Sequence, residues 1–277
     1  MLDCYWYEQG SADLLVTVEQ ADRTAPHYRC VEASPSADDD KNSDPLRSWN
    51  PVCLIVRNML DSVLTTLTAP TLVARGMLRD ASHFDWSTIM FLAIVVYIYT
   101  VEVEYRRWSV VLAGLSLWLM DWFNELVNSA VLHVSNHAAL WTVTGHTSYL
   151  ILVGLSIEIS FFFAILGIIF VKILPADPHR RYFGVPNRVV YVLALSLVCV
   201  CVEISLNAMG VLNWAYWWWN VPFIPLIVIF GYATFFAVAA WVYDMGDNHR
   251  RQLMVVGGIA IVDALLALGL GLAGWLS

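Results

Sequence analysis

An apolar run from Trp108 to His133 most constrains how this chain can fold. The run is 26 residues long and contains no Lys or Arg, so it is long enough to cross a bilayer as a helix. It also contains Asp121, Glu125 and Asn128, whose i, i+4 and i+7 spacing places them on one helical face. Each carboxylate at the bilayer centre costs about 2.5–3.5 kcal/mol even on lenient insertion scales. This face is therefore expected to meet protein or water rather than lipid.

The composition is that of a polytopic membrane protein. Of the 277 residues, 59% are hydrophobic and only 14% are charged, a balance that a soluble domain does not tolerate. The net charge of −8 comes largely from the N-terminal segment, and no basic stripe is present, so we expect no nucleic-acid partner. Residues 1–50 lack the pattern of a cleavable signal peptide, and insertion is expected to rely on internal spans.

The apolar runs predict an all-α polytopic transmembrane helical bundle, with six spans within residues 86–277. The runs cover roughly 86–104, 108–133, 148–172, 189–212, 221–243 and 252–276. Glycines between 257 and 274 predict close helix contacts in the last span.

Two segments precede the bundle. Residues 1–50 are polar and acidic, and we expect them to be mostly disordered or a small mobile appendage. Residues 51–79 have apolar side chains at a spacing of three or four, which predicts an N-terminal amphipathic helix in the membrane interface, broken near Pro70. A seventh span at 51–79 is the alternative.

The basic residues occupy alternate links between the runs. They are Arg106 and Arg107 after the first run, Lys172, Arg180, Arg181 and Arg188 between the third and fourth, and Arg250 and Arg251 between the fifth and sixth. By the positive-inside rule these links are cytoplasmic and the C-terminus lies outside. Asp121 then lies near the midplane, with Glu125 about 6 Å further out.

Acidic residues from four spans share the midplane or outer half, with no Lys or Arg at that depth. They are Asp121, Glu125, Glu158, Glu203 and Asp263. Burial and like-charge neighbours favour the neutral form of a carboxyl group, so some are expected to be protonated at neutral pH. A protonated acid beside an ionised one is a donor–acceptor pair for proton transfer. The alternatives are a bound cation, a water-filled path, or separate hydrogen bonds of each acid to Asn, Ser or backbone.

Amide and indole side chains near these acids are candidate substrate-binding residues. They are Asn124, Asn128, Asn207, Trp122, Trp214, Trp217 and Trp218. The run GVLNWAYWWWNVP at 210–222 is either an interfacial aromatic belt or a roof of aromatic faces over an apolar or cationic guest. His133 and His137 have ligand spacing, but no further His lies at their depth, and no nucleotide fingerprint is present. We therefore expect no metal and no cofactor.

Around Trp122, Asn124, Glu125 and Asp263 the chain resembles small all-helical integral-membrane terpene cyclases of the fungal meroterpenoid type. That family has an Asn-rich early helix with an essential Glu, of N-x-x-W-E flavour, and a distant Asp in the last helix. Here the order differs, because Trp precedes Asn and Glu follows it directly. The resemblance covers a few residues of the second and sixth spans. It implies that Glu125 and Asp263 form the pair that protonates an epoxide or alkene of an isoprenoid.

These features predict an integral membrane enzyme that uses buried carboxylic acids for acid–base chemistry on a lipophilic, isoprenoid substrate, as a cyclase, isomerase or hydratase. Glu125 or Asp121 is expected to be the acid, with Glu158 and Glu203 as its partners, and tryptophans 214–219 are expected to line the outer mouth.

Two other functions use the same features. The first is a proton- or cation-coupled transporter or channel with the acids as a relay, although the sequence has no internal repeat and no matched pair of broken helices. The second is a non-catalytic lipid-binding or assembly subunit. The expected partners are a lipophilic small molecule and membrane lipids, and an oligomer is compatible with the sequence. The expected location is a cell membrane of the bacterial inner-membrane type.

Overall fold

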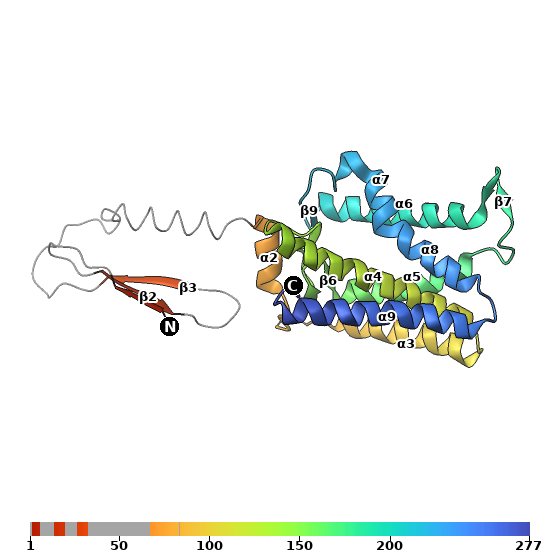
Figure 1. Cartoon of the computed structure of the whole chain (residues 1–277), viewed down its shortest axis with the longest axis horizontal. Helices are drawn as coiled ribbons and strands as arrows, with labels where there is room; N and C mark the ends of the chain where they lie inside the picture. Colours follow the sequence, from red (N-terminus) through yellow and green to blue (C-terminus); the bar gives the residue numbers. More distant parts are fainter. Residues whose placement is uncertain (1, 6–13, 20–26, 33–66, 83) are drawn as a thin grey trace, which may run out of the picture. The chain divides into compact units, whose positions relative to one another are not determined.

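The computed structural model describes residues 2–5, 14–19, 27–32, 67–82 and 84–277, in two units, Met1–Val63 and Leu64–Ser277 (Figure 1). In the first unit, an antiparallel sheet is formed by β1 (Leu2–Tyr5), β2 (Leu14–Glu19) and β3 (His27–Glu32), in that order. The sequence predicts that residues 1–50 are mostly disordered or a small mobile appendage, and three segments within them pair as strands. Strand β2 reads LLVTVE, whose β-branched residues favour a strand although the surrounding segment is polar and acidic.

The second unit is a helical bundle with short strands at its loops. Its long helices are α3 (Trp86–Glu104), α4 (Trp108–Ser135), α5 (Ile157–Ile173), α6 (Asn187–Ala208) and α9 (His249–Leu272). A further long segment consists of the 3₁₀ turn η1 (Val221–Phe223), α7 (Ile224–Leu226), the π-helix η2 (Ile227–Ala233) and α8 (Thr234–Tyr243). Within the described residues, five helices are long and apolar enough to cross a membrane: α3, α4, α6, Val221–Tyr243 and α9. Helix α5 has 17 residues.

The helices begin where the sequence provides capping groups. Asp85 accepts a hydrogen bond from the Ser87 amide at the start of α3, and Asn248 caps α9 in the same way. Pro70, near which the sequence predicts a break, lies in the first turn of α2 (Ala69–Met77), which follows the non-helical residues Leu67 and Thr68. Proline is tolerated there because its missing N–H is not needed in the first turn. The rest of the predicted amphipathic helix, residues 51–66, lies outside the described residues.

The third apolar run is only partly helical, which corrects the predicted span 148–172. Its first residues form a hairpin of β5 (Leu150–Leu152) and β6 (Leu155–Ser156), and α5 begins after Ser156, whose hydroxyl caps it. The fourth run likewise ends early, because β9 (Leu212–Trp214) pairs with β4 (Trp141–Val143). An apolar run alone does not distinguish a buried strand from a buried helix.

Helix α4 is the centre of the bundle and packs against α5, α8 and α9. In its most apolar 18-residue window 56% of residues are buried, against 11% for α3 and for α9. Helices α4 and α5 approach closely at two glycines, where a Cβ on Gly167 would lie 2.5 Å from the Gly114 carbonyl oxygen. A Cβ built on Gly257, Gly258, Gly269, Gly271 or Gly274 of the C-terminal segment would meet nothing within 4 Å. The prediction of close helix contacts from these glycines is therefore wrong.

The three basic links meet at one end of the bundle, opposite α2 and β9 (Figure 1). Ser109 in the first turn of α4 donates to the Gly246 carbonyl at 2.7 Å, and Arg188 pairs with Asp244 at 2.7 Å. The α5–α6 link contains the hairpin of β7 (Arg181–Tyr182) and β8 (Val185–Pro186). The buried carboxylate of Glu102 accepts hydrogen bonds from Lys172 and Arg107, and thereby joins α3 to the ends of its neighbours.

Candidate functional site

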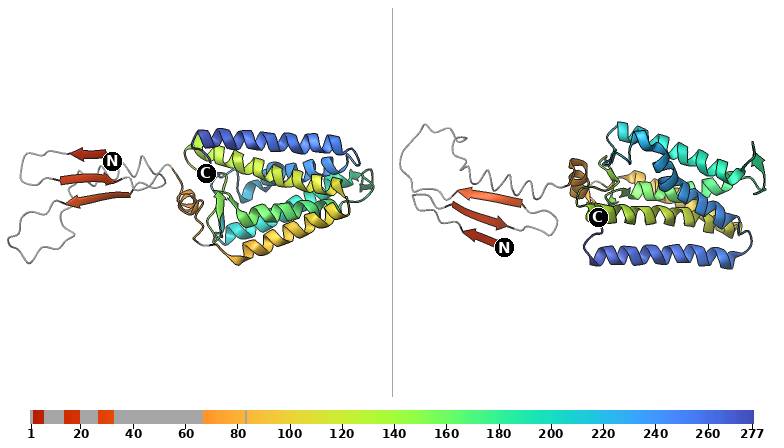
Figure 2. Two further views of the ribbon diagram at one scale, coloured as in Figure 1. Left: turned by 90° about the horizontal axis from the view of Figure 1, so that it is seen from below. Right: turned by 45° about the horizontal axis from the view of Figure 1, so that its top comes forward.

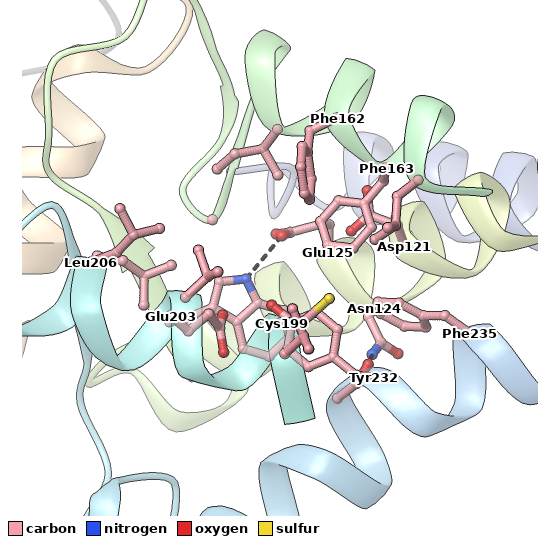
Figure 3. Close-up of a pocket in the computed structure, with 18 of the residues that line it drawn as sticks. Asp121, Asn124, Glu125, Phe162, Phe163, Cys199, Glu203, Leu206, Tyr232 and Phe235 are labelled. Atoms are coloured by element: carbon pink, nitrogen blue, oxygen red, sulfur yellow. Dashed lines mark hydrogen bonds between the residues drawn. The ribbon is translucent and has the colours of Figure 1, made fainter. Parts of the chain in front are cut away.

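The acidic face of α4 borders a cavity of about 350 Å³, a size typical of small-molecule sites. Its walls come from α4, α5, α6 and the η2–α8 segment. Most of the lining is apolar or aromatic and includes Phe162, Phe163, Phe235, Tyr232, Trp141 and Trp219. Figure 3 shows Asp121 and Glu125 on one wall, and Glu203, Cys199 and Tyr232 on the facing wall.

Four of the five predicted acids line this cavity: Asp121, Glu125, Glu158 and Glu203. Asp263 does not line it, so its predicted place in the cluster is wrong. It is buried on α9, which packs on α4 through Leu266 and Leu270 beside Leu126. In Figure 1 and in the right-hand view of Figure 2, α9 and α6 lie on opposite sides of α4, and the cavity lies on the side of α6. The pair of Glu125 and Asp263 that the family resemblance implies therefore shares no cavity.

Glu125 is held by a tryptophan and packed against a glycine. Its Oε1 accepts a hydrogen bond of 2.9 Å from Trp141 Nε1. A Cβ on Gly154, in the β5–β6 turn, would lie 2.5 Å from both Glu125 Oε2 and Trp141 Nε1, so only glycine permits this approach. In the described chain, Glu125 Oε2 is buried without a hydrogen-bond partner. A buried polar atom in this state calls for a proton, a water or a ligand.

Asp121 lies one helical turn before Glu125 and is equally buried, with 3% and 4% of the two residues exposed. Among the described residues, its Oδ2 has no hydrogen-bond partner, and no Lys, Arg or His lines the cavity. Two carboxyl groups in such a place repel each other when both are ionised. Sharing a proton or binding a cation relieves this repulsion, so the pair is suited to proton transfer.

Glu158 borders the cavity but already has hydrogen-bond partners. Thr147 Oγ1 donates to its Oε2 at 2.6 Å, and the Ser148 amide donates to its Oε1 at 2.7 Å. These bonds tie the first turn of α5 to the link that precedes β5. For Glu158 the structure therefore fits the alternative in which an acid only forms hydrogen bonds to its neighbours.

Glu203 lies on α6 with Cys199 one turn earlier, and its carboxylate interacts with the Tyr232 hydroxyl of η2. Sequence analysis did not identify Tyr232. A π-helix adds a residue per turn and changes the face on which each side chain lies, so helical periodicity does not place Tyr232 in the cavity. One wall of the cavity thus contains the Asp121–Glu125 pair, and the facing wall contains Glu203.

The three predicted asparagines have different positions. Asn124 lines the cavity and donates to the Gly231 carbonyl at 3.2 Å. Asn128 lies outside the lining, because its amide holds β4: it donates to the Trp141 carbonyl at 2.9 Å and accepts from the Leu140 amide at 2.7 Å. Asn207 also lies outside and donates to the Leu212 carbonyl at 3.1 Å.

The four tryptophans predicted to bind substrate do not line the main cavity, but one tryptophan of the predicted mouth, residues 214–219, does. Trp122 donates to Ser160 between α4 and α5, Trp214 is in the core, and Trp217 is 74% exposed. Trp219, from the same aromatic run, does line the cavity and stacks on Trp141 with ring centroids 5.9 Å apart. No sequence signal marks Trp141, since the non-local pairing of β4 with β9 positions it.

A second cavity of about 270 Å³ adjoins the first. Trp218, which sequence analysis placed in the site, lines this one. The two cavities share three lining residues, Asn124, Trp141 and Trp219. The rest of the second lining is apolar and consists of Val127, Leu140, Leu226 and Phe230.

The exposed lining residues of α5 and α6 indicate that the main cavity opens sideways between these two helices. Helix α6 packs mainly on η2 and α8. Lining residues of α5 and α6 are also exposed on the outer surface: Phe162 is 47%, Val198 57% and Val202 51% exposed. All three are apolar, so this rim suits contact with lipid chains rather than water.

The part of the chain that the structure describes contains no group of three or more His, Cys, Asp or Glu placed to hold a metal ion. His133, one of the two histidines with ligand spacing, contacts Ser277 Oγ at 2.7 Å and stacks on Trp275. The chemistry available in the cavity is that of carboxyl, hydroxyl, thiol and amide groups.

Comparisons with known proteins add the membrane assignment. A family model described as "Uncharacterized membrane protein family" matches residues 68–271. An Archaeoglobus fulgidus protein described as uncharacterized is 50% identical over 204 residues, which cover 73% of this chain and 96% of the relative. A second protein of that organism, also described as uncharacterized, is 40% identical over 57 residues, 20% of this chain and all of the relative. No solved structure matches. Both relatives are archaeal and give no support to the expected bacterial membrane.

Proposed function

The chain belongs to the uncharacterized membrane protein family, and from its site we propose that it is an integral membrane enzyme for acid–base chemistry on a lipophilic substrate. One observation carries the proposal. Asp121 and Glu125 are buried side by side at an aromatic cavity that opens between α5 and α6, and each has an oxygen without a hydrogen-bond partner in the described chain. Such a site combines apolar walls with a few convergent polar groups.

The proposed membrane topology has six spans, with α5 as the shortest. At 1.5 Å per residue, α5 is about 25 Å long, slightly short of a hydrocarbon core of about 30 Å. Its neighbours α3, α4 and α8 pack against it. The three links that meet at the basic end are cytoplasmic in this topology, since they contain the Lys and Arg of the loops between the spans.

The proposed reaction is protonation of an isoprenoid double bond. A carboxyl group of the Asp121–Glu125 pair transfers its proton to one alkene carbon, and the π electrons form the new C–H bond. The cation left on the other carbon is attacked by a second double bond in a cyclisation. Loss of a proton to a carboxylate then forms the product alkene, so that the net reaction is an isomerisation. The aromatic faces of Trp141, Trp219 and Phe163 stabilise the cation, and Glu203 with Tyr232 faces the acid pair as a proton acceptor.

The transporter alternative requires a polar path from the acids to the basic end. On that side of Asp121, α4 contributes Leu117, Ala113 and Val110 to the hydrophobic core. A relay across the bundle has no support from these residues, whereas the side opening fits a membrane-dissolved substrate.

The test compares Glu125→Gln with Asp263→Asn in cells that express the protein, through their extracted lipids. Gln keeps the shape of Glu and the acceptor for Trp141 but cannot exchange the proton, so we expect a folded protein that no longer changes the prenyl lipids. Asp263→Asn removes another buried acid outside the cavity and should leave the lipid change intact.

A Glu125→Gln variant that changes the lipids as the unaltered protein does would remove Glu125 from the site. No lipid change from the unaltered protein, together with proton or sodium flux in vesicles, would support the transporter instead.

A further inference from the structure

The second cavity differs in chemistry from the first. Four carboxylates line the first cavity and none lines the second, among the residues that the structure describes. The non-aromatic polar side chain of the second lining is Asn124, whose amide already donates to the main-chain carbonyls of Phe230 and Gly231. The second cavity is therefore suited to hold hydrocarbon rather than to react with it.

The boundary between the cavities is built from three side chains on different elements. Trp141 comes from β4, Trp219 from the link before η1, and Asn124 from α4. The two indole rings stack with an interplanar angle of 28°, and Trp141 also holds Glu125. An apolar chain that passes from the first cavity to the second therefore runs along aromatic faces and next to the acid pair.

We propose that the two cavities bind one extended isoprenoid chain, whose reactive double bond lies beside Glu125 and whose terminal segment occupies the second cavity. The chain enters from the bilayer between α5 and α6, past Phe162 and Val202. The second cavity then sets the length of the chain beyond the reacting bond. This inference rests on the proposed function, since it assigns the terminal segment of the same substrate to a second cavity beside that site.

The shape and the chemistry of the two cavities together favour an isoprenoid chain. A straight acyl chain needs no aromatic boundary, whereas a chain of repeated double bonds gains from the faces of Trp141 and Trp219 along its length. The two volumes, about 350 and 270 Å³, divide the chain between a reacting and a non-reacting segment.

The experiment uses two photoreactive probes, geraniol and geranylgeraniol with a diazirine at the end remote from the hydroxyl, and the full chain in lipid nanodiscs. Val127→Trp fills the second cavity from its rim, because Val127 lines only that cavity and is 36% exposed. Val134→Trp, at a position 74% exposed on the same helix, adds the same side chain outside both cavities and is the matched control. Labelled peptides are mapped by mass spectrometry.

In the unaltered protein the long probe should label Leu226–Phe230, and the short probe should label only the first cavity, near Phe162 and Cys199. Val127→Trp should reduce labelling of the second cavity by about tenfold or more, as expected when a pocket excludes an apolar group, without reducing labelling by the short probe. Mapping in the unaltered protein gives a result even if the variant does not fold.

Two outcomes would overturn the inference, and they differ in what else they affect. If the long probe labels only the first cavity, or if Val127→Trp behaves like Val134→Trp, the second cavity does not hold the chain, while the acid–base function stands. If neither probe labels either cavity, the isoprenoid substrate of the proposed function is refuted as well.

Discussion

Replacing Gly154 by Ala tests how the site holds Glu125. The added Cβ would lie 2.5 Å from Glu125 Oε2, 2.5 Å from Trp141 Nε1 and 2.6 Å from Asn128 Nδ2, all closer than carbon can approach these atoms. Because Asn128 also holds the backbone of β4, none of the three side chains can move without losing a hydrogen bond.

The expected cost follows from these contacts. Inserting one carbon into a packed core costs about 1–3 kcal/mol. Displacing Trp141 leaves a buried acceptor of Glu125 unpaired, at about 1–3 kcal/mol more. Since both effects arise from one clash and do not add fully, we expect a loss of about 2–4 kcal/mol in the free energy of unfolding. For a unit of this size that lowers the apparent Tm by about 4–16 °C.

The assay is thermal unfolding of detergent-solubilised protein, with Gly257→Ala as the control. Gly257 lies inside α9, and a Cβ there meets nothing within 4 Å, so this variant should unfold at the same temperature or slightly higher. Trp141→Phe removes the indole nitrogen that the added Cβ would meet. In the Trp141→Phe background, Gly154→Ala should therefore lower the free energy of unfolding by at least about 0.5 kcal/mol less than it does in the unaltered protein.

Equal unfolding temperatures for Gly154→Ala and Gly257→Ala would refute this account of Glu125. Full additivity of the Gly154→Ala and Trp141→Phe losses in free energy of unfolding would refute it too, because the effect of Gly154→Ala would then arise elsewhere in the turn.

Two further predictions concern the basic end and the aromatic boundary. Glu102→Gln should lower the free energy of unfolding by about 1–3 kcal/mol in the same assay. This is less than for a fully buried ion pair, because Lys172 and Arg107 are half-exposed. An unchanged Tm would show that the Glu102 charge does not join α3 to its neighbours. Trp219→Ala should lower the free energy of unfolding by about 3 kcal/mol, the low end for an aromatic truncation because the ring borders both cavities. Trp217→Ala, at an exposed position, should change it by no more than about 0.5 kcal/mol. Equal effects of the two substitutions would contradict the assignment of Trp219 to the boundary.

The sequence alone determined the membrane character, the approximate helices and the acidic face of α4. These depend on local composition and on helical periodicity, which tertiary packing does not change. Asp121 and Glu125 share a face because of their spacing, and the cost of a carboxylate in lipid predicts that this face meets protein or water. The structure places both residues at the cavity.

Tertiary structure decided which other groups lie beside Asp121 and Glu125 at the cavity. Asp263 is buried on α9, as Asp121 is on α4, but α9 packs on the side of α4 away from the cavity. Trp141 reaches Glu125 through a strand pairing between residues about seventy positions apart, and the π-helix η2 places Tyr232 at Glu203. Pairing and register of this kind depend on contacts between distant segments, and a single sequence gives no periodic signal for them.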